Sequence, residues 1–140
     1  MRRSIIAVAV IAVAGTFAGT FAGTAFAQAP ATGPQSTRFF NTPLEKDPSR
    51  EVRLQMVVHK PGPGNPFHTH PGDQWEVVIE GEITYMVRGQ PPRVLKTGES
   101  VYIPRGTIHR NENKSGRETR TIELLIVEKD KPQSTPAPAE

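Results

Sequence analysis

The sequence predicts an all-β domain, and two observations carry this prediction. Most segments between residues 50 and 130 are short, rich in β-branched and aromatic residues, and separated by Gly, Pro or Asn. No window outside the N-terminal segment shows the apolar period of about 3.6 residues that marks an amphipathic helix. Many short strands at regular spacing indicate a β-sandwich or a β-barrel.

The expected strands follow one another closely. The first, EVRLQMVVH at residues 51–59, alternates apolar residues with Arg53 and Gln55, and we interpret Arg53 as an ordinary strand charge. The others are, in order, WEVVIEG, EITYMVRG, RVLKTG, SVYIPRG, IHRNEN and TRTIELLIVEK. The stretches EGE at residues 80–82 and RGQPP at residues 88–92 predict hairpin turns, because Gly admits positive φ and Pro restricts φ.

The N-terminal segment predicts a cleaved secretory signal at residues 1–27. Arg2 and Arg3 precede an apolar stretch, and Ala25-Phe26-Ala27 forms an A-x-A cleavage site. An uncleaved membrane anchor is the alternative, because residues 4–27 carry no charge. We therefore expect a periplasmic or secreted protein that has no membrane contact after cleavage.

The remaining chain has room for a single hydrophobic core. Residues 28–37 and 132–140 are rich in Pro, Ala, Ser and Gln, so we expect a disordered linker and a disordered tail around a folded domain at residues 38–131. Without Arg2 and Arg3 the formal net charge falls from +3 to +1, and no basic cluster indicates a nucleic-acid partner. The chain contains no cysteine, so a metal would be held by His, carboxylate or amide oxygen.

The stretch NPFHTHPGDQWEV carries the candidate metal ligands. His68 and His70 are two residues apart, so in a strand their rings point to the same face. His109 follows a second turn framed by Gly and Pro, and Gln74 or Glu76 could add an oxygen ligand. His59 lacks such framing, and we interpret it as an exposed residue at a strand end.

Two longer motifs resemble a known family. The stretch Gly62-x5-His68-x-His70-x3-Gln74-x6-Gly81 resembles the first cupin motif, and Gly98-x5-Pro104-x-Gly106-x2-His109-x3-Asn113 resembles the second. The resemblance implies a single-domain cupin of exported bacterial type, with a jelly-roll β-barrel and frequent homodimers. It also implies one divalent metal held inside the barrel by His68, His70, Gln74 and His109. Iron, manganese, nickel, copper, cobalt and zinc all suit such nitrogen and oxygen ligands.

One position departs from the family pattern, because Gln74 stands where the family usually has Glu. The site then has no anionic ligand, which favours Lewis-acid chemistry on an anionic or enolate substrate. Glu76 shares the face of Gln74, and three roles remain open for it: general base or proton shuttle, ion-paired structural carboxylate, or direct ligand. Trp75 should point away from both, and Tyr85 and Tyr102 are interpreted as core residues.

Three classes of function are compatible with these residues. The first is a mononuclear metalloenzyme acting on a small organic molecule, of dioxygenase, isomerase or lyase type, with Glu76 moving a proton. The second is a non-catalytic, metal-dependent module that binds a sugar or an organic acid. The third is a barrel kept for structure or dimerisation alone. The intact ligand set favours the first two.

Overall fold

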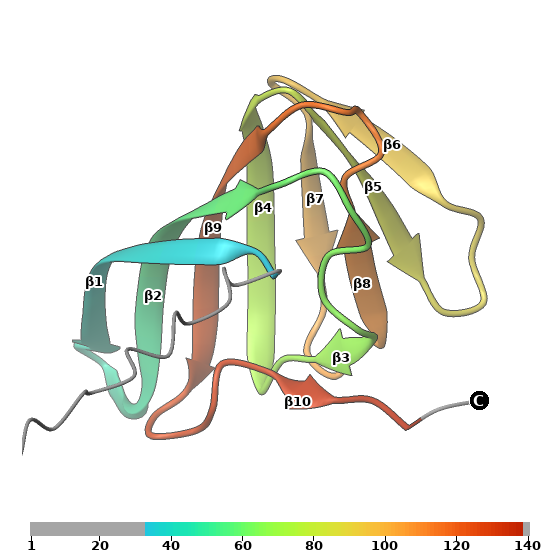
Figure 1. Cartoon of the computed structure of the whole chain (residues 1–140). Coiled ribbons are helices and arrows are strands. Elements are labelled where there is room, and N and C mark those ends of the chain that lie inside the picture. Colours follow the sequence, from blue (N-terminus) through green and yellow to red (C-terminus); the bar gives the residue numbers. More distant parts are fainter. Residues whose placement is uncertain (1–32, 139–140) are drawn as a thin grey trace, which may run out of the picture.

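The computed structural model describes residues 33–138. Strands are the regular secondary structure within that range (Figure 1), so the all-β prediction is confirmed. Among the described residues there is no helix long and apolar enough to cross a membrane. The predicted secretory signal at residues 1–27 lies outside the described residues.

The strands form two five-stranded sheets with antiparallel neighbours. The first sheet contains, in spatial order, β1 (Gln35–Leu44), β2 (Asp47–His59), β9 (Thr119–Glu128), β4 (Gly72–Glu80) and β7 (Ser100–Ile103). The second contains β10 (Thr135–Pro136), β3 (His68–Thr69), β8 (His109–Glu112), β5 (Glu82–Val87) and β6 (Arg93–Lys96). Figure 1 shows the two sheets facing each other across a shared interior.

One predicted turn is wrong and the other is confirmed. β4 and β5 lie in different sheets, so EGE at residues 80–82 is a crossover and not a hairpin. Gly81 has a φ of 84°, and a Cβ at this position would lie 2.7 Å from Thr119 Oγ1. Glycine therefore lets the chain leave one sheet and enter the other within a single residue. The stretch RGQPP joins the paired strands β5 and β6 and is a hairpin turn as predicted.

The inward face of the first sheet carries many polar side chains. The buried polar residues of β2 and β9 are Glu51, Arg53, Gln55, His59, Thr119, Thr121 and Glu123. Arg53 is therefore not an ordinary strand charge: it is 5% exposed, and its Nε donates to Glu51 Oε1 at 2.7 Å. A buried guanidinium needs such a partner, because an isolated buried charge is strongly destabilising.

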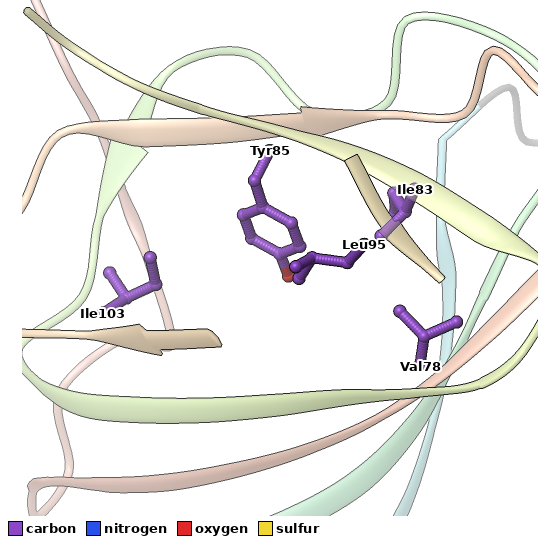
Figure 2. Packing of buried hydrophobic residues seen from close by; sticks show 5 residues of the cluster. All are labelled: Val78, Ile83, Tyr85, Leu95 and Ile103. Atoms are coloured by element: carbon purple, nitrogen blue, oxygen red, sulfur yellow. The ribbon is translucent and has the colours of Figure 1, made fainter. Parts of the chain in front are cut away.

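The apolar core lies between the two sheets (Figure 2). It consists of Val78 and Ile103 from the first sheet and Ile83, Tyr85 and Leu95 from the second. Leu95 is fully buried, and burial of such a side chain stabilises the fold by about 1.5–3 kcal/mol. These contacts hold β4 against β5 and so set the separation of the inward side chains on the two sheets.

The strands extend past the expected limits of the folded domain. β1 begins at Gln35, inside the segment whose composition predicts a linker, and β10 lies at Thr135–Pro136, inside the expected tail. Gln35 is paired with Val58, and Pro136 is paired with His68. An edge strand obtains backbone hydrogen bonds from the sheet it joins, which composition alone does not reveal.

Candidate metal centre

Three histidine side chains come together at one end of the interior. His68 belongs to β3 and His109 opens β8, and the two residues are paired directly across these neighbouring strands. His70 follows β3 by one residue. The ring centroids lie 4.5 Å apart for His68–His109, 4.9 Å for His68–His70 and 5.1 Å for His70–His109. One ligand nitrogen from each ring can be chosen so that all three lie within 4.8 Å of one another.

Each of the three rings binds a backbone carbonyl through Nδ1. The distances are 2.8 Å from His68 to Pro66 O, 2.6 Å from His70 to Gln133 O, and 3.0 Å from His109 to Thr107 O. A carbonyl oxygen only accepts hydrogen bonds, so Nδ1 carries the proton in each ring. Nε2 is then left with a free lone pair, which is the state that a metal-binding imidazole requires.

Burial keeps the imidazoles of His70 and His109 neutral. It lowers the pKa of His70 to about 4, and it lowers the pKa of His109 to about 4 as well. Desolvation disfavours the imidazolium form, and the neighbouring histidines add charge repulsion. Neutral imidazole is the ligand form, so at pH 7 no proton competes for these nitrogens.

Gln74 supplies an oxygen beside the histidines. Its side chain is 2% exposed and lies beside the His70 ring. Its Nε2 donates to Glu76 Oε2 at 3.2 Å, which fixes the orientation of the amide. Its Oε1 is buried and has no hydrogen-bond partner, and the same is true of His70 Nε2. Two orphaned buried lone pairs on neighbouring side chains fit a divalent cation.

Glu76 points inward, as the alternation of β4 predicts, but it groups with different residues. It is 2% exposed, and its Oε2 accepts a hydrogen bond from the Tyr85 hydroxyl. Its carboxylate clusters with His59 and Glu123 and not with the three histidines. Burial, followed by repulsion from Glu123, raises the pKa of Glu76 well above the usual carboxyl value.

The interpretation of His59 as an exposed residue is wrong. It is 3% exposed, and its Nε2 lies 3.0 Å from Thr121 Oγ1 and 3.7 Å from Glu76 Oε1. The parity of β2 carries the signal that finds it: His59 shares the face of Gln55 and Arg53, which is the inward one. Burial lowers the pKa of His59 to about 4.

The aromatic residues divide between the interior and the surface. Trp75 points away from Gln74 and Glu76 as predicted, is 41% exposed, and stacks on Tyr102 with ring centroids 5.1 Å apart. Tyr85 is a core residue as predicted and is 3% exposed. The interpretation of Tyr102 as core is wrong, because it is 51% exposed on the outer face of β7.

Two cavities border this end of the molecule. A cavity of about 270 Å³ lies between β5, β6 and β7 and the turns beside them; its lining includes Tyr85, Arg93, Ile103 and Thr107. A second cavity, of about 180 Å³, is lined by His68 and Phe67 together with Pro136. The larger cavity is lined by Tyr85, which donates to Glu76, and by Thr107, whose carbonyl accepts from His109, so it is placed to receive a small molecule.

Comparison with known proteins identifies relatives of part of this chain. The family model described as "Cupin domain" matches residues 55–127. Dimethylsulfoniopropionate lyase DddQ of Ruegeria pomeroyi is 39% identical over 54 residues, which is 38% of this chain and 27% of that protein. The uncharacterized protein YdbB of Bacillus subtilis is 34% identical over 64 residues, or 45% of this chain and 53% of that protein. The matches thus span less than two thirds of the length of either relative.

Solved structures share the fold. A cupin-like protein from Thermotoga maritima superimposes with a TM-score of 0.63 and 26% identity, covering 77% of this chain and 79% of that one. Oxalate oxidase in complex with glycolate superimposes with a TM-score of 0.58 and 23% identity, covering 77% of this chain and 57% of that one. The second likeness bears on the fold alone, and together the two confirm the predicted cupin-type architecture.

Proposed function

The chain belongs to the cupin domain family, and from this premise we propose that it is a metal-dependent enzyme of lyase or isomerase type that acts on a small organic substrate. The observation that carries the proposal is the state of the three histidines. All of them direct Nδ1–H to backbone carbonyls, and their ligand nitrogens converge beside the unpartnered Oε1 of Gln74.

In this proposal His68, His70, His109 and Gln74 hold one divalent transition metal. Such a metal supplies a Lewis acid that polarises a substrate oxygen and makes a neighbouring C–H bond more acidic. All four ligands are neutral, so the ligand set leaves the charge of the cation uncompensated. This favours substrates that are anionic, or become so in the reaction, and it favours elimination or isomerisation over dioxygenase chemistry.

The Tyr85–Glu76 pair is suited to moving the proton that such a reaction releases. Tyr85 lines the larger cavity, and its hydroxyl donates to Glu76 Oε2 in the buried interior. Burial raises the pKa of Glu76, which brings this carboxyl closer to the range in which a general base works at neutral pH. Substrate would occupy the cavity, Tyr85 would contact it, and Glu76 would hold the proton behind Tyr85.

Several observations support a small organic acid as the substrate class. The cavity has a volume of about 270 Å³, which suits a molecule of a few heavy atoms. Its lining includes one guanidinium, that of Arg93, which is chemically complementary to a carboxylate. The relative from Ruegeria pomeroyi is a lyase of dimethylsulfoniopropionate, so this molecule is a reasonable first probe among short organic acids.

The proposal is tested with the protein from residue 28 onward, its metal content and its turnover of a panel of short organic acids. We expect His68→Ala to lose about one equivalent of bound metal per chain. Glu76→Gln should retain the metal of the three-histidine site and bind the acid, but lose turnover by about 100-fold or more. Retained metal and acid binding with no turnover in the unmodified protein would instead identify a binding module for organic acids. No metal in any preparation, even after reconstitution, refutes the metalloenzyme.

Export and self-association complete the proposal. The proposed secretory signal at residues 1–27 would direct the protein to the periplasm or out of the cell, which cell fractionation would test. The outward face of the first sheet supports a homodimer, because its side chains are largely apolar and partly exposed: Val52, Leu54, Met56, Trp75, Val77, Ile79, Ile122, Leu124 and Tyr102. A contiguous apolar face of this kind is typical of a protein interface, and light scattering of the purified protein gives its mass directly.

A further inference from the structure

Two buried carboxylates face each other inside the first sheet. Glu76 of β4 is paired directly with Glu123 of β9, and Glu123 is paired with Gln55 of β2 on its other side. Both glutamates point into the interior, with exposures of 2% and 7%. Like charges directly opposite each other in a sheet are destabilising, and burial strengthens the repulsion. This arrangement requires a compensating group, which is either a proton shared by the two carboxyls or a cation.

Hydrogen-bond donors orient the two carboxylates. Glu123 Oε2 accepts from Gln55 Nε2 at 2.7 Å. Glu76 Oε2 accepts from the Tyr85 hydroxyl and from Gln74 Nε2. Gln55 engages one oxygen of Glu123, Tyr85 and Gln74 engage one oxygen of Glu76, and Glu76 Oε1 is left buried without a hydrogen-bond partner. Donors that fix one oxygen and leave the other free are the usual surroundings of a carboxylate that binds a metal.

His59 completes a three-residue group around the free oxygen. Its Nε2 lies 3.7 Å from Glu76 Oε1, which is too long for a hydrogen bond. One ligand atom from each of His59, Glu76 and Glu123 can be chosen so that all lie within 4.8 Å of one another. All three side chains are more than nine-tenths buried. One imidazole and two carboxylates are a common donor set for divalent transition metals.

The buried guanidinium of Arg53 on this face does not neutralise the Glu76–Glu123 pair. Arg53 lies on the same face of β2 but is engaged by Glu51, through Nε at 2.7 Å, and by Lys131 O at 2.8 Å. His59 is held neutral by burial. A divalent ion between the two carboxylates would balance both charges and satisfy the unpartnered Glu76 Oε1 at once.

We propose that His59, Glu76 and Glu123 form a second divalent cation site, separate from the three-histidine centre. The two differ in charge: the three histidines and Gln74 form a neutral set, whereas this set carries two carboxylates. The second site accordingly prefers harder ions such as Mn²⁺ or Fe²⁺ relative to the first. The Gln74–Glu76 hydrogen bond joins the two sites, since one partner is a ligand residue of each.

This inference stands independently of the proposed reaction. The cation binds Glu76 Oε1, whereas the proposed proton relay uses Oε2, the oxygen that faces Tyr85. A bound cation would lower the pKa of Glu76 and weaken the relay, but ion binding itself does not depend on the relay. A protein without turnover could still hold both ions, and an enzyme could work with the three-histidine site alone. Metal stoichiometry therefore tests the second site without any measurement of activity.

The experiment is equilibrium dialysis of the metal-free protein from residue 28 onward against Mn²⁺, followed by metal analysis, with Co²⁺ as a second probe. The unmodified protein should bind about two ions per chain, and Glu123→Gln should bind about one. His68→Ala should also bind about one, because it disrupts only the other site. Glu80→Gln is the matched control on β4, where the carboxylate is exposed, and it should bind as many ions as the unmodified protein.

Folding is controlled by urea unfolding of the metal-free proteins. Glu123→Gln removes the like-charge repulsion and keeps an acceptor for Gln55, so the metal-free variant should be at least as stable as the unmodified protein. About one ion per chain in the unmodified protein, lost in His68→Ala and kept in folded Glu123→Gln, overturns the second site. Loss of both ions in folded Glu123→Gln also overturns it, because the two sites would then not be separate.

Discussion

Tyr85→Phe removes a single oxygen atom from the interior and leaves the shape of the core unchanged. Tyr85 is 3% exposed, and its ring packs with Ile83, Leu95 and Ile103 (Figure 2). The phenylalanine ring retains these contacts, so no cavity forms. What is lost is the hydroxyl that donates to Glu76 Oε2.

The expected cost follows from the surroundings of that bond. Both partners are almost fully buried, and water cannot replace the lost donor. Glu76 Oε2 retains the Gln74 Nε2 donor at 3.2 Å, so the oxygen is not wholly unsatisfied. Loss of a buried hydrogen bond to a carboxyl group costs about 1–3 kcal/mol in the free energy of unfolding.

The assay is urea unfolding of the metal-free protein, with Tyr102→Phe as the matched control. Tyr102 makes the same kind of bond, from its hydroxyl to Asp73 Oδ1 at 3.1 Å, but its side chain is 51% exposed. Tyr102→Phe should change the free energy of unfolding by less than about 0.5 kcal/mol. Tyr85→Phe should lower the midpoint by about 1 M urea.

Equal effects of the two substitutions would refute the reasoning. Such a result would mean that the Tyr85–Glu76 bond contributes no more than a surface bond. The proton relay proposed for this pair would then lose its structural support. A larger effect confined to Tyr85→Phe supports a tightly held pair and calls for the turnover measurement next.

Two further predictions concern the histidines. Gly106 has a φ of 74° at the turn before His109, so Gly106→Val strains the backbone by about 1–2 kcal/mol. The substitution should displace His109 and reduce the metal bound at the three-histidine site. Unchanged metal content contradicts this prediction. Burial lowers the pKa of His59 from 6.5 to about 4, so the unfolded chain binds more protons than the folded one between these values. Protonation of His59 should therefore lower the free energy of unfolding of the metal-free protein by up to about 3 kcal/mol as the pH falls from 6.5 to 4. Urea unfolding at both pH values measures this loss, and His59→Gln should abolish the contribution of this residue.

Much of the candidate centre could be predicted from local spacing. His68 and His70 share a face because a strand has a period of two residues, and the same period places Gln74 and Glu76 together on the inward face. The Gly and Pro residues before His109 indicate a tight return of the chain. Strand parity and turn residues depend only on neighbouring positions, so they can be read from the sequence.

Other features depend on partners that are distant in the chain. The EGE stretch satisfies the rules for a hairpin turn, yet the strands on either side join different sheets, because Gly81 packs against Thr119 of β9. Tyr102 has an aromatic side chain of the kind found in cores, but it lies on the outer side of β7. Local composition cannot distinguish these cases.

The sequence by itself determined the all-β class, the cupin resemblance and the histidine set, because each rests on spacing within a few residues. Only the tertiary structure decided which face of β2 points inward and which residues it meets there. Alternation defines two faces but not their partners, and the burial of a polar face depends on hydrogen bonds from other strands. His59, Glu76 and Glu123 come together only because β2, β9 and β4 are neighbours in one sheet.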